Sequence, residues 1–598
     1  MNGNKNVLFA IALSAAVLFI WQYFVATPSM KAEQARQAQL SHQGKAKPAT
    51  AEAAPGLPGV AAGDGHLSRE AALKVGGARV TIDTPMVDGS ILLKGARLDD
   101  LRLKKYRDTV DPKSPEIVLL APKSTDYPYY AEFGWIGGSA SNHMPDGNSQ
   151  WTQTGGSTLS PGHPVTLSWD NGQGLVFTRA IAIDDKYLFT VTDSVANKGA
   201  AAVSLFPFGY VARQSIPKTT TNWILHQGFV GVAGGNEVDA KYDDFKDAGT
   251  PPKTFASTGG WVGITDKYWM AAVVPPQGEA FNGEYRGAKT AAGADAYQAD
   301  YRLNARAIAP GASTSVTHRL FAGAKVVDIL RGYQDSQNIA HFDLAVDWGW
   351  FWFFTRPLFW LLDNFNKLLG NFGLAILALT VVVKILFFPL ANAGFRSMAK
   401  MKKVQPQMEA LKKAHGDDPQ KLQQHMMELY KREKVNPVSG CFPILIQIPV
   451  FFSLYKVLFV TIEMRHAPFF GWIQDLSAPD PTSLLNLFGL IPYNPHTALP
   501  AFLSFLSIGA WPILYGATQW VQTKLNPPPA DPVQAKMFAF MPVIFTFMFA
   551  TFPAGLVIYY AWNNTLTVIQ QYFIMKRSGV EITFFDNIKP KKLKAAND

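Results

Sequence analysis

Residues 372–390 have the sequence FGLAILALTVVVKILFFPL, which is apolar apart from Thr380 and Lys384. These nineteen residues, as an α-helix, rise about 28 Å, close to the thickness of the hydrocarbon core of a bilayer. A lysine inside such a helix is costly to expose to lipid, so it should face protein or a water-filled cavity. Thr380 and Lys384 are four residues apart and therefore share one helix face. The stretch predicts a membrane span, placed at residues 368–391, with a polar stripe.

Five further apolar stretches have the composition of membrane spans, so six spans are predicted in total. The first, residues 7–26, is uncharged and follows Lys5. A cleaved signal peptide is the alternative, but the apolar region is longer than usual and no convincing small-x-small site follows it. We therefore expect an uncleaved anchor. The other predicted spans are residues 441–462, 502–523, 537–551 and 555–575.

Basic residues gather in the segments that flank these spans. Residues 392–440 and the tail 576–598 carry an excess of Lys and Arg, whereas residues 463–501 carry three acids and one arginine. The positive-inside rule places the two basic segments, and with six spans both chain ends, in the cytoplasm. The net charge of +10 is then explained by anionic membrane lipids. No direct DNA binding is expected, because no basic block with interleaved aromatics occurs away from the membrane flanks.

The segment 392–440 has the pattern of two helices joined by a turn. Apolar residues recur at spacings of three and four on both sides of the sequence HGDDP. Gly416 is suited to end the first helix, and Asp418 to cap the second, with Pro419 at its first position. We predict a cytoplasmic helical hairpin with a narrow apolar seam. Its lysines form either a solvated face or a docking surface for acidic partners or lipid headgroups.

Residues 68–340 have the pattern of a β domain. Short runs that alternate or are rich in β-branched residues, such as 175–183, are separated by turn dipeptides such as Asn171-Gly172. Many such strands predict a large exported antiparallel sandwich. Trp135, Trp151 and Trp261 could bind sugar or peptide, but packing in the core is the simpler interpretation.

Nothing in this domain resembles a catalytic or cofactor site. It contains no recognisable nucleophile motif, no metal-spaced His/Cys cluster and no Gly-rich phosphate loop. We therefore expect no enzymatic activity, no cofactor and no metal. The single cysteine, Cys441, also excludes an intrachain disulfide.

Two segments connect this domain to the membrane. Residues 27–67 are rich in Ala, Gln, Pro and Gly and lack aromatics, which predicts a flexible linker. Residues 341–367 contain four tryptophans just before a span, which favours an interfacial amphipathic helix over a buried core helix. The predicted domains, in chain order, are 1–26, 27–67, 68–340, 341–367, 368–391, 392–440, 441–462, 463–501, 502–523, 524–536, 537–551, 555–575 and 576–598.

Polar residues in three predicted spans are the candidate site. They could line one polar concavity inside the bundle: Thr380, Lys384, Gln447, Tyr560, Asn564 and Thr567. Two simpler explanations are that polar side chains join membrane helices by hydrogen bonds, and that Lys384 extends to the nearby interface. Spans two to six contain no acidic residue and show no inverted repeat, which disfavours an ion-coupled transporter.

Residues 342–571 resemble the YidC family of membrane protein insertases, relatives of the Oxa and Albino proteins. The resemblance is carried in order by DWGWFWFFTRPLF, FRSMAKMKKVQPQMEALK, GDDPQKLQQHMMELYKREKVNPVSGCFPILIQIPVFFSLYKVL, DPVQAKMFAFMPVIFTFMF and FPAGLVIYYAWNNTLTVIQQ. The N-terminal anchor and exported domain are similar, by size and position, to those of Gram-negative members. The resemblance implies a polytopic helical membrane protein with a periplasmic β-supersandwich between spans one and two.

The resemblance also implies a function. Family members insert and help fold nascent inner-membrane proteins through a hydrophilic groove that holds a positive residue, usually arginine. Lys384 stands at the matching position, and Thr380 and Tyr560 match residues that contact the incoming helix; Gln447 and Asn564 complete the predicted groove. The implied partners are nascent membrane proteins, membrane lipids, the Sec translocon, and the ribosome and signal-recognition machinery, received by the hairpin and basic tail. The implied location is the bacterial inner membrane.

Two other functions remain open from the sequence. One is a solute transporter with a carbohydrate-sensing periplasmic domain. The other is an exported sugar-modifying enzyme anchored to the membrane.

Overall fold

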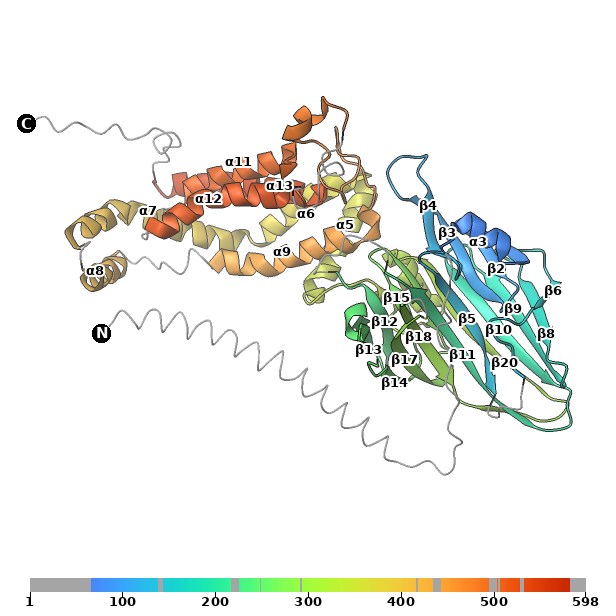
Figure 1. Cartoon of the computed structure of the whole chain (residues 1–598). Helices are drawn as coiled ribbons and strands as arrows, with labels where there is room; N and C mark the ends of the chain where they lie inside the picture. Colours follow the sequence, from blue (N-terminus) through green and yellow to red (C-terminus); the bar gives the residue numbers. More distant parts are fainter. Residues whose placement is uncertain are drawn as a thin grey trace, which may run out of the picture.

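The computed structural model describes residues 66–137, 143–216, 225–247, 249–290, 293–415, 418–433, 442–493, 503, 506–526 and 532–580. The predicted first span and the linker up to residue 65 lie outside these residues, as does the tail beyond residue 580. The described chain has two parts, a β domain and a bundle of helices joined end to end (Figure 1).

The β domain consists of two sheets, in which all the pairings but one are antiparallel. The larger sheet contains β1 (Arg79–Asp83), β2 (Val87–Leu92), β3 (Arg97–Arg107), β4 (Glu116–Leu120), β5 (Tyr129–Gly137), β7 (Thr158–Leu159), β11 (Val203–Gln214), β14 (Lys253–Thr258), β17 (Ala280–Lys289), β18 (Asp295–Leu303) and β19 (Arg306–Ile308). The smaller contains β6 (Thr152–Gly155), β8 (Val165–Asp170), β9 (Leu175–Ile183), β10 (Leu188–Asn197), β12 (Gly228–Ala233), β13 (Asn236–Lys241), β15 (Gly260–Thr265), β16 (Trp269–Val274) and β20 (Ser313–Ala324).

Alternating side chains place the core between these sheets. In β9, every second residue from Leu175 to Ile183 is buried, as the period of a half-buried strand requires. The Tyr129 hydroxyl joins the sheets, donating to the Ile264 carbonyl at 2.7 Å and accepting from the Ala271 amide at 3.0 Å. Trp135, Trp151 and Trp261 are all buried, so the core interpretation of these tryptophans is confirmed.

The helices divide between the β domain and the bundle. Two short ones belong to the β domain, α3 (Arg69–Val75) and α4 (Val327–Ser336). The others are α5 (Trp352–Leu369), α6 (Phe372–Leu386), α7 (Phe388–His415), α8 (Pro419–Arg432), α9 (Phe442–Val460), α11 (Ala510–Leu525), α12 (Pro532–Phe549) and α13 (Ala554–Arg577). Helices α7 and α8 lie at the end of the bundle away from the β domain (Figure 1).

The helix predicted over residues 372–390 is interrupted. Helix α6 ends at Leu386, and α7 starts at Phe388 at an angle of 68° to it. Pro389, in the first turn of α7, has no N–H to continue the α6 hydrogen-bond ladder. Among the described residues, no single helix has both the length and the apolarity to cross a membrane, but α6 and α7 together meet that test.

Helices α7 and α8 pack against each other along the predicted seam. Val404 and Leu429 are buried, and the rings of His415 and His425 stack with their centroids 4.6 Å apart. The Asp418 carboxylate accepts from the amides of the first turn of α8, as the sequence predicts for a cap.

The bundle contacts the β domain through the chain that follows α9. Glu463 accepts a hydrogen bond from the Val327 amide at the start of α4, at 3.0 Å. Arg465 donates to the Arg107 carbonyl of β3 at 2.6 Å. Within α9 itself, Lys456 pairs with Asp347, in the segment before α5, at 2.5 Å. These contacts fix the end of the bundle that carries α5 against the sandwich.

Candidate functional site

Lys384 lies in the last turn of α6 and reaches across to α13. Its Nζ donates to the Thr567 hydroxyl at 2.6 Å, and that hydroxyl donates onward to the Asn563 carbonyl at 2.6 Å. A hydroxyl can donate once and accept, so this chain of bonds satisfies Thr567. Among the described residues, no carboxylate forms an ion pair with Lys384. The cation is therefore held by a neutral group.

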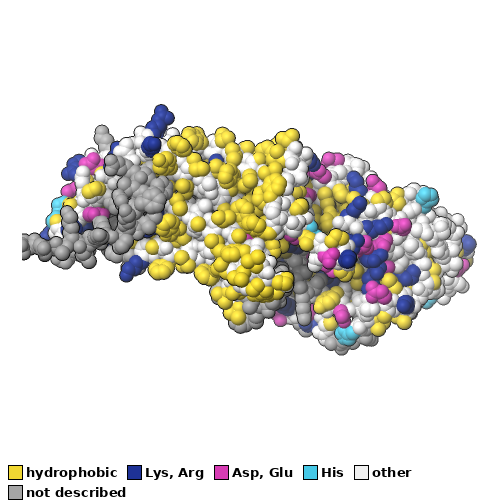
Figure 2. Space-filling view, turned by 90° about the horizontal axis from the view of Figure 1, so that it is seen from above, with side chains coloured by type: hydrophobic (Ala, Val, Ile, Leu, Met, Phe, Trp, Pro, Cys, Tyr) yellow, Lys and Arg dark blue, Asp and Glu magenta, His cyan; other side chains and the backbone are white. Residues whose placement is uncertain are grey.

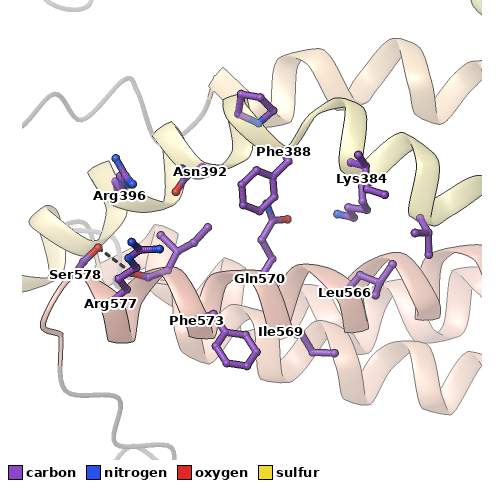
Figure 3. Close-up of a pocket in the computed structure, with 14 residues that line it drawn as sticks. Lys384, Phe388, Asn392, Arg396, Leu566, Ile569, Gln570, Phe573, Arg577 and Ser578 are labelled. Atoms are coloured by element: carbon purple, nitrogen blue, oxygen red, sulfur yellow. Dashed lines mark hydrogen bonds between the residues drawn. The ribbon is translucent and has the colours of Figure 1, made fainter.

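Lys384 also lines a pocket of about 810 Å³ between α6, the start of α7 and the second half of α13. Figure 3 shows Lys384 at one end of this pocket, Gln570 and Phe388 in the middle, and Arg396 with Arg577 at the other end. The lining residues are Val381, Lys384, Ile385, Phe388, Pro389, Asn392, Arg396, Leu566, Ile569, Gln570, Phe573, Ile574, Arg577 and Ser578. Three of them are cations and none is acidic, so the pocket suits an anionic or electron-rich occupant.

The polar residues predicted to share a groove with Lys384 lie deeper between the helices. Thr380 is buried, and its hydroxyl donates to the Ile376 carbonyl of its own helix at 2.6 Å. The Asn564 amide donates to the Gln519 side chain of α11 at 2.8 Å. Neither residue lines the 810 Å³ pocket.

Tyr560 is enclosed by an aromatic cluster. Its ring lies 5.1 Å from Phe451, 6.1 Å from Tyr515 and 5.0 Å from Phe549, measured between centroids. Its hydroxyl is buried and has no hydrogen-bond partner among the described residues. A buried hydroxyl without a partner costs free energy.

Along α13, the buried polar residues follow one another at helical spacing. Tyr560, Asn564, Thr567 and Gln571 are all buried on the same side of the helix. The predicted Gln447 belongs to α9, but its side chain is outside the described residues. The structure thus places Lys384 and Thr567 in direct contact and leaves the roles of Thr380, Gln447, Tyr560 and Asn564 as predictions.

Sequence reasoning did not single out Arg396, Gln570 or Arg577 as site residues. Gln570 and Arg577 are seven residues apart, which puts them on one face of α13. That spacing was a usable signal for two of them. Arg396 could not be assigned, because the bend before α7 decides which way its helix faces.

The surface of the bundle differs from that of the β domain. Figure 2 shows hydrophobic side chains covering much of the bundle, with charged side chains gathered over the β domain and at the opposite end. Large exposed apolar residues include Ile385, Leu386, Phe540, Ile544 and Phe573. A continuous exposed apolar surface of this kind marks a region that contacts lipid or protein.

Comparison with known proteins gives matches over nearly the whole chain. The family model described as YidC periplasmic domain matches residues 79–361, and that described as 60Kd inner membrane protein matches residues 364–581. A protein named membrane protein insertase YidC from Methylobacterium radiotolerans is 51% identical, with 98% of this chain and 97% of that protein covered. One of the same name from Rhizobium meliloti is 52% identical, with 98% of each covered.

A solved structure of an active YidC insertase, with its first transmembrane domain resolved, is also similar. It is 18% identical, with a TM-score of 0.36, and the match covers 83% of this chain and 92% of that one.

Proposed function

Because the chain belongs to the YidC family of membrane protein insertases, we propose that it inserts proteins by way of Lys384 and the pocket beside it. Its family membership makes it an inner-membrane insertase with a periplasmic β domain. The groove, the membrane topology and the partners below are proposals that go further.

The proposed topology has six spans with both ends in the cytoplasm. Helices α7 and α8 and the basic tail lie on the cytoplasmic side, and the β domain lies on the periplasmic side. The distribution of basic residues supports this orientation. Exposed tryptophans on and beside α5, namely Trp350, Trp352 and Trp360, suit the periplasmic headgroup level, next to the β domain.

The observation that carries the proposed mechanism is the hydrogen bond from Lys384 to Thr567. A cation among apolar helices is retained only at a cost, and here a neutral hydroxyl does not cancel its charge. Lys384 is therefore available to attract an acidic group of an incoming chain.

The pocket lowers the barrier for a polar chain end to cross. Moving polar groups through hydrocarbon costs several kcal/mol per unsatisfied group. The pocket offers such groups a cation and polar side chains partway across the membrane. The apolar segment of the client then leaves along the exposed surface of α6, where Ile385 and Leu386 are about 70% exposed. Burial of that segment in lipid, at about 25 cal/mol per Å², drives the step.

The proposal needs no bond chemistry, nucleotide or metal. The α7–α8 pair and the tail would receive the nascent chain from the ribosome or its targeting machinery, and cooperation with the Sec translocon follows from the family relation. A Met-containing seam such as that between α7 and α8 can adapt to different partners.

Site-specific photocrosslinking tests the route. A photoactivatable residue at position 384, 388 or 569, each of which lines the pocket, should crosslink to a stalled nascent membrane protein. Position 544 on α12 is the matched control, because Ile544 is exposed and does not line the pocket. Crosslinks from 544 alone would contradict the proposed route. Saturable flux of a small solute in empty liposomes would instead favour a transporter.

A further inference from the structure

The end of the pocket opposite Lys384 has features that the insertase mechanism does not use. Arg396 on α7 and Arg577 on α13 both lie at this end of the pocket (Figure 3). Both are exposed, and among the described residues neither forms an ion pair. Two helices thus bring two guanidinium groups to one place without a carboxylate to balance them.

Gln570, between the two ends, provides a second observation. Its Nε2 is buried and has no hydrogen-bond partner among the described residues, and its side chain points into the middle of the pocket (Figure 3). A buried N–H without an acceptor is costly. The pocket therefore offers unsatisfied donors at its centre as well as at its charged end, and the occupant that satisfies them must be an acceptor.

The apolar residues that line the pocket further restrict the kind of molecule that fits it. Eight of the fourteen lining residues are apolar, and four of them remain strongly exposed: Ile385 (68%), Phe388 (49%), Ile569 (46%) and Phe573 (65%). A free inorganic anion would leave these four residues uncovered. A molecule with an anionic head and a long apolar tail would cover them. The pocket volume of about 810 Å³ is within the usual range for small-molecule sites.

The geometry points to a binding site for an anionic phospholipid. Its phosphate would lie at Arg396 and Arg577, an ester carbonyl oxygen would accept from Gln570, and its acyl chain would lie along Ile385, Phe388, Ile569 and Phe573. Guanidinium groups bind phosphate oxygens in pairs and more strongly than neutral donors do. Under the proposed topology, the end of α13 lies at the cytoplasmic headgroup level, where anionic lipids are found. An acidic peptide segment also satisfies the cations, but it does not require the apolar wall.

The lipid would occupy the mouth of the pocket while no client is bound. Lys384, at the other end, keeps its bond to Thr567 and remains available. A client entering from the cytoplasmic side must then displace the lipid, which makes lipid composition a regulator of entry. This consequence rests on the proposed insertion route, whereas the binding site itself does not.

Lipid binding to the purified full chain tests the site without any client. Native mass spectrometry would compare phosphatidylglycerol and phosphatidylcholine with identical acyl chains. The test variant is R396Q/R577Q. The matched control is K400Q/K576Q, which removes two exposed cations from the same two helices, neither of which lines the pocket. R396K/R577K, which keeps the charge, checks that the arginine positions tolerate substitution.

We expect R396Q/R577Q to weaken phosphatidylglycerol binding about tenfold or more, because two charge-assisted contacts are lost. The control should change it less than about twofold, and phosphatidylcholine should bind weakly throughout. Phe573→Ser should weaken binding as well, since the acyl chain loses a contact.

Equal losses of phosphatidylglycerol binding in the test and control variants would overturn the proposed site. Displacement of the lipid by millimolar inorganic phosphate would assign it to a free anion, and preference for an acidic peptide would assign it to clients. A failure of Lys384 to crosslink clients would leave these results unchanged, so the two proposals can fail separately.

Discussion

Arg179 in the β domain and Lys384 in the helical bundle are both cations that contact the interior of the fold, but their burial and their partners differ. Arg179 is 1% exposed and binds both carboxylate oxygens of Asp193, at 2.6 and 3.0 Å. It also donates to the carbonyls of Ala96 and Phe133. Its charge is cancelled and nearly all its donors are used, as a buried arginine in a stable core requires.

Lys384 has no such arrangement within the described residues. Its partner is the neutral hydroxyl of Thr567, and it faces a pocket rather than a packed core. Arg179 is a fully buried cation held by a carboxylate, whereas Lys384 is a half-buried cation held by a hydroxyl that it can exchange for another partner. The difference indicates which charge stabilises the fold and which can act on another molecule.

The largest effect is expected from breaking the ion pair between Arg179 and Asp193. Arg179→Met leaves Asp193 buried without its cation and should lower the free energy of unfolding of the β domain by about 3–5 kcal/mol. The double variant Arg179→Met/Asp193→Leu should recover most of this loss, because no charge is left unpaired. Urea unfolding of the full chain, followed by tryptophan fluorescence, measures both; Trp151 packs on Arg179. A single variant no worse than the double would mean that the pair is not what stabilises this core.

A pH-dependent contact joins the two regions. Burial raises the pKa of Glu463 to about 7 from its ordinary value of 4.5. Its Oε2 is buried without a hydrogen-bond partner among the described residues, while Oε1 accepts from the start of α4. The docked state therefore holds a proton that the undocked state releases above pH 4.5. Docking should weaken between pH 4.5 and 7, by roughly 3 kcal/mol in all, and become constant above pH 7.

Hydrogen exchange measures this docking. The amide of Val327 should lose protection between pH 5 and 8, after correction for intrinsic exchange rates. Glu463→Gln is the control, because an amide keeps an acceptor but does not titrate. The Gln variant should be protected equally at both pH values. A wild-type chain with the same flat profile would show that Glu463 docks without its proton.

Reversing the charge at Lys384 should have a smaller effect. This effect should appear in insertion activity and not in the stability of the fold. Lys384→Glu repels acidic client segments and should slow insertion of acidic-tailed clients roughly tenfold, equivalent to about 1.4 kcal/mol. Clients with neutral tails should be affected less. Insertion into proteoliposomes, with protease protection as the readout, gives both rates. Equal slowing for both client types would point to a packing defect instead of a charge effect.

Sequence patterns predicted much of this architecture for a physical reason. Strands with a period of two, turn dipeptides and an Asp-Pro cap act locally, so the sandwich and the start of α8 could be anticipated from neighbouring residues. The position of Lys384 was also local, since one charge in an apolar stretch is conspicuous. Its resemblance to a family cation gave it a role, but not a partner.

The pocket and the hydrogen-bond partners in it could not be predicted, because they depend on how the helices pack against one another. Local sequence patterns do not encode that packing. Pro389 explains why a break falls near Leu386, but nothing in the local sequence specifies the 68° angle between α6 and α7. That angle brings Arg396 and Arg577 to the same end of the pocket. Likewise, Thr380 could be placed on the same face as Lys384, but its bond to its own helix could not be foreseen.

The smallest expected effect comes from exchanging the cation while keeping its charge. Lys384→Arg should change insertion rates by less than about twofold, because attraction of a carboxylate depends mainly on charge. Thr567→Val removes the hydroxyl partner of Lys384 but keeps the shape of the side chain. It should lower the free energy of unfolding by at most about 1 kcal/mol. The two variants separate the contributions: if charge alone matters, insertion should be near normal in both, whereas a requirement for the Lys384–Thr567 bond predicts that Thr567→Val fails although the charge at position 384 is intact. The second outcome would make Lys384 a structural cation like Arg179, with its hydroxyl partner in place of a carboxylate, and the contrast between the two regions would no longer identify the functional charge.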